Sequence, residues 1–113
     1  MAMEPTEFIG LHVTVMVDRP LGARHPEHGY VYPINYGYLP GEIAADGEPL
    51  DAYVVGVLEP LTHFSGRCIA VIHRLDDDDD KLVVVTDGAE VSDDEIRRIT
   101  HFQERFFRSV IRR

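Results

Sequence analysis

The chain has 113 residues, which is enough for one hydrophobic core and too few for two, so we expect a single domain over residues 1–113. Its content of 44% hydrophobic and 27% charged residues is typical of a globular protein and argues against wholesale disorder. The formal net charge of -9 argues against a nucleic acid or an anionic membrane surface as the main partner, and an anionic substrate would need bridging cations.

The first predicted element is a strand near the N-terminus. Residues 11–17 alternate with a period of two, which is typical of a half-buried strand, and Pro20 ends the pattern. Residues 21–51 are rich in glycine and proline and predict a long irregular segment, interrupted by a short aromatic strand over residues 30–32. Segments of this length in a compact domain are usually functional.

Three more strands are predicted in the middle of the chain. They cover residues 52–58, 67–75 and 82–86. The five consecutive aspartates from Asp76 to Asp80 lie between the last two strands, so we expect them to form the turn of a hairpin.

A helix is predicted towards the C-terminus. Ser92 and Glu95 form a capping box at its start. The apolar stripe that follows has three- and four-residue spacing and consists of Ile96, Ile99, Phe102, Phe106 and Val110. A helix packed on a sheet explains this stripe better than a membrane-surface helix, whose polar face would be basic throughout. The elements together predict a mainly β (α+β) fold, a small antiparallel barrel or curled sheet covered by one helix.

The sequence contains no signal for export or membrane insertion. The N-terminal residues are acidic where a signal peptide has bases, and no stretch reaches the length of a transmembrane helix. The single cysteine, Cys68, excludes an intramolecular disulfide and lies in an apolar run typical of a core residue. We therefore expect a cytoplasmic protein without a membrane partner.

The first candidate site is an acidic segment directly before the predicted strand over residues 52–58. Asp46, Glu48 and Asp51 are held together in a short stretch that Gly47 and Pro49 constrain. Carboxylates held in this way can converge on a hard cation such as Mg²⁺. An ordinary solvated turn is the alternative, and this motif alone favours the turn.

Two further clusters support a site for a charged ligand. The carboxylates of the predicted hairpin turn repel one another unless cations neutralise them. Lys81 follows this turn directly and is the only lysine in the chain, which suits a point charge that holds phosphate. Tyr32 and Tyr38 are expected to be core aromatics, whereas Tyr36, just before a glycine, could present its hydroxyl to the same site.

Taken together and in this order, these motifs resemble those of the soluble family I inorganic pyrophosphatases. The family signature is Asp-x-Asp-Pro-x-Asp downstream of Tyr-Pro-x-Asn-Tyr-Gly, and this chain has Tyr-Pro-Ile-Asn-Tyr-Gly-Tyr at residues 32–38 and Asp-Gly-Glu-Pro-Leu-Asp at 46–51. The resemblance covers roughly residues 11–110. It implies a five-stranded OB-like barrel with flanking helices, a requirement for Mg²⁺ with Mn²⁺ as an alternative, inorganic diphosphate as the substrate and, in many members, a homo-oligomer.

The resemblance also implies a set of metal ligands. The matching positions are Asp46, Asp51, Asp76 and Asp79. Asp18 is a looser match for a metal-associated glutamate, and Glu27 is a loose match for a later one.

Other positions are implied to be catalytic or substrate-binding. Glu48 stands where the family has the aspartate that helps to activate the nucleophilic water, and Lys81 and Tyr36 match phosphate-contacting residues. Arg24 or His25 replaces a family lysine, and Arg24 is the predicted substrate contact.

The sequence departs from the family pattern in its phosphate-holding half. The hairpin that carries the family arginine before Tyr32 has no counterpart, and the Tyr-Lys pair of the last helix is replaced by Phe106 and Phe107. A slow enzyme or one directed to another phosphoanhydride is therefore compatible with the sequence. A non-catalytic magnesium- or phosphate-binding module derived from the same fold is the alternative, and a calcium- or manganese-binding structural barrel is a third.

Overall fold

The computed structural model describes residues 3–45 and 47–113. The elements in chain order are η1 (Pro5–Phe8), β1 (His12–Arg19), β2 (Asn35–Ile43), β3 (Pro49–Val54), β4 (His63–Arg74), β5 (Lys81–Val85), α1 (Asp93–Glu104) and β6 (Ser109–Arg112). Within the described ranges, no helix has the length and apolar character needed to cross a bilayer.

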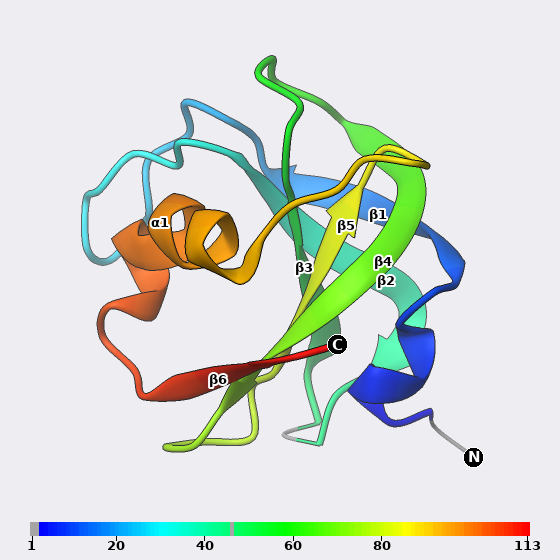
Figure 1. The fold of residues 1–113 in the computed structure, drawn as a ribbon. Coiled ribbons are helices and arrows are strands. Elements are labelled where there is room, and N and C mark those ends of the chain that lie inside the picture. The colour runs from blue at the N-terminus through cyan, green and yellow to red at the C-terminus, as the bar shows by residue number, and fades with distance from the viewer. Residues whose placement is uncertain (1–2, 46) are drawn as a thin grey trace.

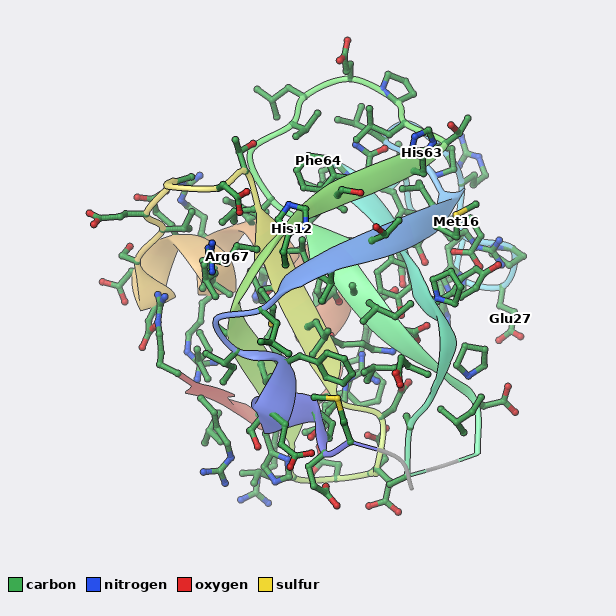
Figure 2. The ribbon with its side chains drawn as sticks, turned by 90° about the vertical axis from the view of Figure 1, so that its right-hand side faces the viewer. His12, Met16, Glu27, His63, Phe64 and Arg67 are labelled. Carbon is green, nitrogen blue, oxygen red and sulfur yellow. The ribbon has the colours of Figure 1, made fainter. Side chains whose placement is uncertain are left out.

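The strands form a closed five-stranded barrel with one added strand. The sheet order is β1-β2-β3-β5-β4-β6, and β1 also pairs with β4, which closes the barrel. In that closing pair His12 lies opposite Arg67 and Met16 lies opposite His63, and Figure 2 shows the two strands crossing this face side by side. All named pairs are antiparallel except β3 with β5. The predicted fold, a barrel of strands with a helix towards the C-terminus, is confirmed.

Period-two alternation along the strands produces two apolar clusters, one on each face of the sheet. Ala52 and Val54 belong to the cluster inside the barrel, whereas Tyr53 and Val55 belong to the cluster on the other face. Ile96 of α1 packs into that second cluster, and Figure 1 shows the helix lying against one side of the barrel.

The helix is shorter than the apolar stripe predicts. The Ser92 half of the predicted capping box is present, because Ser92 Oγ accepts a hydrogen bond from the Glu95 backbone N–H at 3.2 Å. The helix ends at Glu104, however, so Phe106 and Val110 are not helical and their assignment to the stripe is wrong. Val110 pairs with His73 in the β4–β6 ladder, which satisfies backbone groups that a longer helix would otherwise satisfy internally. Phe106 lies in the turn between α1 and β6, and its side chain is 53% exposed.

The segment predicted to be irregular contains a complete strand, β2. Its Gly37 allows a close approach to β1, because a Cβ at this position would overlap the backbone carbonyl of Met16. The short strand expected over residues 30–32 is reduced to one bridge between Arg24 and Val31. The predicted strands over residues 52–58 and 67–75 are both shifted towards the N-terminus, where they begin at Pro49 and His63.

Candidate functional site

A pocket of about 590 Å³ lies beside the C-terminal end of α1. Its charged lining residues are Asp18, Arg19, Asp51, Arg74, Asp79 and Lys81. The remaining lining residues are His25, His28, Tyr30, Tyr32, Tyr36, Gln103, Phe106 and Phe107. The segment from β1 to β2 supplies the tyrosines and histidines, and Figure 1 shows it running past the end of the helix.

Strand register places three of these side chains on one face. Asp51 lies opposite Lys81 in the parallel pair of β3 and β5. Tyr36 lies opposite Tyr53, two residues along β3 from Asp51, and side chains two residues apart share a face of a strand. The carboxylate, the ammonium and the phenol therefore project from neighbouring strands towards the same space.

Lys81 and Tyr36 converge on one carboxylate. Lys81 Nζ donates to Asp51 Oδ2 at 2.7 Å, and the Tyr36 hydroxyl donates to the same oxygen at 2.7 Å. Lys81 Nζ also lies 2.8 Å from Asp79 Oδ2, and its side chain is 2% exposed. Burial and the neighbouring Asp51 raise the pKa of Tyr36 well above its ordinary value, so this phenol stays protonated and serves as a donor.

Burial disfavours the charged form of two other pocket carboxylates, Asp79 and Asp18. Burial raises the pKa of Asp79 and outweighs the attraction of Lys81, while repulsion from Asp51 adds to the rise. Burial likewise raises the pKa of Asp18, and Asp51 again contributes. Asp18 is at a register shift in β1, and such bulges redirect a side chain. Both carboxylates would be stabilised in their charged form by an additional cation.

Arg74 is a buried cation of the pocket wall that sequence reasoning missed. Its Nη2 donates to Glu104 Oε2 at 2.8 Å and its Nε donates to Glu104 Oε1 at 3.1 Å. Nη1 lies 3.4 Å from Asp79 Oδ2, and the guanidinium carbon is 3.6 Å from the centre of the Phe107 ring. The available signal was an arginine close behind the apolar run of residues 68–72, where a buried basic side chain needs a partner.

Polar side chains connect Arg74 to the aromatic half of the pocket. Tyr30 and Tyr32 both donate to Gln103 Oε1, at 2.9 and 3.1 Å. Gln103 Nε2 donates to the Tyr53 hydroxyl at 2.8 Å, and this hydroxyl donates to Glu104 Oε2 at 2.6 Å. The buried residues Gln103 and Glu104 therefore fix the position of the aromatic rings relative to the charged groups.

The structure brings five of the predicted site residues to this pocket, namely Asp18, Tyr36, Asp51, Asp79 and Lys81. Asp46 lies outside the described residues. Glu48 is exposed just before β3 and is absent from the described lining of the pocket, and its predicted role stays a prediction.

Three other predicted residues also lie elsewhere among the described residues. Asp76 accepts a hydrogen bond from the backbone N–H of Arg108 at 2.7 Å. Arg24 donates to the Gly29 carbonyl at 2.7 Å, and Glu27 is exposed at the edge of the molecule in Figure 2. None of the three side chains is part of the pocket lining described above, and their roles likewise stay predictions.

The donor chemistry of the pocket fits a hard divalent cation. Asp18, Asp51 and Asp79 supply carboxylate oxygens, the ligands that Mg²⁺ prefers. Over the described ranges, no group of three or more histidine, cysteine, aspartate or glutamate side chains is already gathered closely enough to hold a metal. The reason in this pocket is that the Lys81 ammonium stands between Asp51 and Asp79, and a cation there would share or displace this ion pair.

Comparisons with known proteins agree on one family. The sequence profile described as "Inorganic pyrophosphatase" matches residues 13–112. An inorganic pyrophosphatase of Ralstonia nicotianae is 32% identical over 107 residues, covering 80% of this chain and 58% of that protein. One of Saccharolobus solfataricus is 39% identical over 57 residues, covering 49% of this chain and 33% of that protein. The chain thus spans less than two thirds of the length of these relatives.

Solved structures share the fold. The inorganic pyrophosphatase of Ehrlichia chaffeensis has a TM-score of 0.69 at 19% identity and covers 89% of this chain and 84% of its own. That of Thermus thermophilus has a TM-score of 0.68 at 20% identity and covers 89% of this chain and 82% of its own.

Proposed function

Because the chain belongs to the inorganic pyrophosphatase family, we propose that it is a magnesium-dependent inorganic diphosphatase, which hydrolyses inorganic diphosphate to two phosphates. The observation that carries this proposal is the placement of Lys81 between Asp51 and Asp79, with Tyr36 bonded to Asp51, in one pocket. Cation-binding carboxylates and a phosphate-holding ammonium are two of the components that such a phosphoryl transfer uses.

The pocket carboxylates would hold the metal. Asp18, Asp51 and Asp79 are the candidates in the pocket, and Asp46 and Asp76 are proposed from the sequence to complete the set. A bound divalent cation neutralises phosphate oxygens and lowers the pKa of coordinated water.

The chain's own residues would position the substrate and orient the carboxylates. Lys81 is already desolvated, so its ammonium can donate to a phosphate oxygen at little further cost. Tyr36 orients Asp51 through its hydroxyl, and Arg74 lies beside Asp79 and restrains it. Glu48 stays the proposed acceptor of the water proton, acting from the segment that precedes β3.

Phosphate release from inorganic diphosphate tests the proposal. The purified protein should release phosphate with Mg²⁺ and none with a chelator. Tyr36→Phe keeps the ring and removes the hydroxyl from Asp51, and we expect a loss of about 10-fold or more in kcat/KM. Lys81→Ala should raise KM, with the melting temperature checked because Lys81 is buried. Leu58→Ala, which is 82% exposed and outside this pocket, is the matched control.

Metal binding and phosphate release, measured together, separate the enzyme from a non-catalytic module. Millimolar Mg²⁺ should raise the melting temperature of the wild type, because a ligand that binds only the native state stabilises it, and Asp51→Asn should blunt this rise. A Mg²⁺-dependent rise without phosphate release in Mg²⁺ or Mn²⁺ would favour the binding module. The absence of both would reject the shared metal site.

The wider context is proposed from the family and the sequence. We expect a single domain over residues 1–113, a cytoplasmic location, and a homo-oligomer as in many members. Size-exclusion chromatography with light scattering measures the oligomeric state.

A further inference from the structure

One half of the pocket is a wall of aromatic rings. The rings of His28, Tyr30 and Phe106 are nearly parallel, with interplanar angles of 9°, 20° and 23° and centroid separations of 5.7 to 6.4 Å. His25 packs against these three rings, and its ring centroid lies 4.8 Å from the centroids of both His28 and Tyr30. Offset parallel rings at such spacing are mutually attractive, so they hold one common orientation.

The wall is anchored at one end and open at the other. Tyr30 is fixed by its hydrogen bond to Gln103, which belongs to the buried network around Arg74. Phe106 is 53% exposed because α1 ends two residues before it, and His28 is exposed as well. The exposed rings therefore contribute little to the core and present aromatic surface to the pocket, with the Arg105 guanidinium carbon 4.9 Å from the centre of the Phe106 ring.

The geometry around His25, which packs against the wall, is that of a neutral imidazole. His25 Nδ1 accepts hydrogen bonds from the backbone N–H groups of Glu27 and His28, each at 3.1 Å, so this nitrogen is unprotonated. Burial lowers the pKa of His25, in agreement with this geometry. A neutral imidazole stacks on a planar ring as the neighbouring aromatics do.

Inorganic diphosphate has no ring that could stack on the aromatic wall. That substrate consists of charged oxygens around two phosphorus atoms, and the charged half of the pocket around Lys81 suffices for it. The pocket volume of about 590 Å³ is in the range of sites that hold organic ligands, which combine apolar walls with a few fixed polar groups.

We propose that this pocket accepts an organic phosphoanhydride with a planar ring, of which a nucleoside diphosphate is the simplest, with its phosphates beside Lys81 and its base against His28 and Phe106. The inference rests on the proposed function, because it uses the same phosphate site. In the reaction, water adds to the terminal phosphorus and the bond from this phosphorus to the anhydride oxygen breaks. The products are a nucleoside monophosphate, inorganic phosphate and a proton.

Binding of two non-hydrolysable analogues isolates the contribution of the ring. The chain has no tryptophan, so Phe106→Trp introduces a single tryptophan into the wall, whose fluorescence can be followed. With Mg²⁺ present, α,β-methylene-ADP and methylenediphosphonate present the same two phosphorus atoms with and without adenosine. We expect α,β-methylene-ADP to quench the tryptophan fluorescence of the Phe106→Trp variant. We expect the wild type to bind α,β-methylene-ADP about 5- to 150-fold more tightly than methylenediphosphonate, because base stacking on an aromatic ring contributes a factor of this size.

Kinetics provide the second readout. Phe106→Ala should lower kcat/KM for ADP more than for inorganic diphosphate, by a ratio of about 5- to 150-fold. Leu58→Ala should leave this ratio unchanged.

Hydrolysis of inorganic diphosphate with equal affinity for the two analogues would overturn the inference while the proposed function stands. Tight, quenching binding of α,β-methylene-ADP without hydrolysis of either substrate would support the ring site and reject the proposed function. A Phe106→Ala variant that keeps its wild-type melting temperature and loses both activities equally would overturn the ring contact.

Discussion

Arg74→Met is expected to destabilise the protein strongly, because it leaves a buried carboxylate without its cation. Arg74 is 4% and Glu104 is 8% exposed, and two hydrogen bonds join them. Removing one partner of a buried ion pair costs about 3 to 5 kcal/mol. We expect the lower end, about 3 kcal/mol, because the Tyr53 hydroxyl still donates to Glu104.

This cost converts to a measurable shift in the melting temperature. At about 2.1 cal/mol/K per residue, unfolding of 113 residues carries an entropy of about 0.24 kcal/mol/K. A loss of about 3 kcal/mol then lowers the melting temperature by about 13 °C. Thermal unfolding followed by circular dichroism at pH 7 measures it.

The control and the rescue use the same ion-pair chemistry. Arg67 is on the same strand, but its partner Asp87 is 53% exposed, so Arg67→Met should cost less than about 1 kcal/mol. Adding Glu104→Gln to Arg74→Met should recover part of the loss, because the amide needs no cation. An Arg74→Met protein that melts within about 2 °C of wild type, or a double variant as unstable as the sum of the singles, would refute the reasoning.

Three further changes test separate parts of the structure. Glu48→Gln should lower kcat for inorganic diphosphate about 100-fold with little change in KM, and activity that survives would place the proton acceptor elsewhere. Burial raises the pKa of Asp18 above 3.8, so its contribution to stability is present below that pH and is lost as the pH rises through the folded-state pKa. At pH 7 with a chelator, Asp18→Asn should therefore melt higher than wild type, and a lower melting temperature would contradict this sign. Gly37→Ala should cost at least about 1 to 3 kcal/mol, measured by urea unfolding, because its Cβ would overlap the Met16 carbonyl; an unchanged midpoint would show that β1 and β2 can separate freely.

Elements with a clear period were predictable, and those that depend on pairing with distant strands were not. β1 and β5 follow their apolar patterns closely. β2 was missed because Gly37 and Pro40 are typical of loops, although they lie in a strand that pairs on both sides. The helix was predicted too long because Phe106 and Val110 continue its spacing by chance. The edge of β4, which captures Val110 in β6, is a tertiary feature without a local signal.

The residues of the candidate site could also be predicted only in part. Asp51 and Asp79 were predicted from the resemblance of the ordered motifs to a known family, whereas Lys81 also stood out as the only lysine in the chain. The contact of Arg74 with Glu104 joins β4 to α1, and nothing local predicts which arginine finds a buried carboxylate. Asp51 reaches the pocket because it shares a face of β3 with Tyr53, whereas Glu48 precedes the strand and lies outside that alternation.

The parallel pairing of β3 with β5 has a consequence for how the protein folds. Asp51 and Lys81 are 30 positions apart, and the intervening chain contains β4, which pairs with β5 on its other side. Contacts between distant segments form slowly, because the entropy of closing the loop is lost before the contact gives any return. The Asp51–Lys81 contact is therefore expected to form after the local contacts of α1 and of the β4–β5 hairpin during refolding. A partly folded chain would have a helix and hairpins but no phosphate site, so recovery of ligand binding should lag behind recovery of the far-ultraviolet dichroism signal.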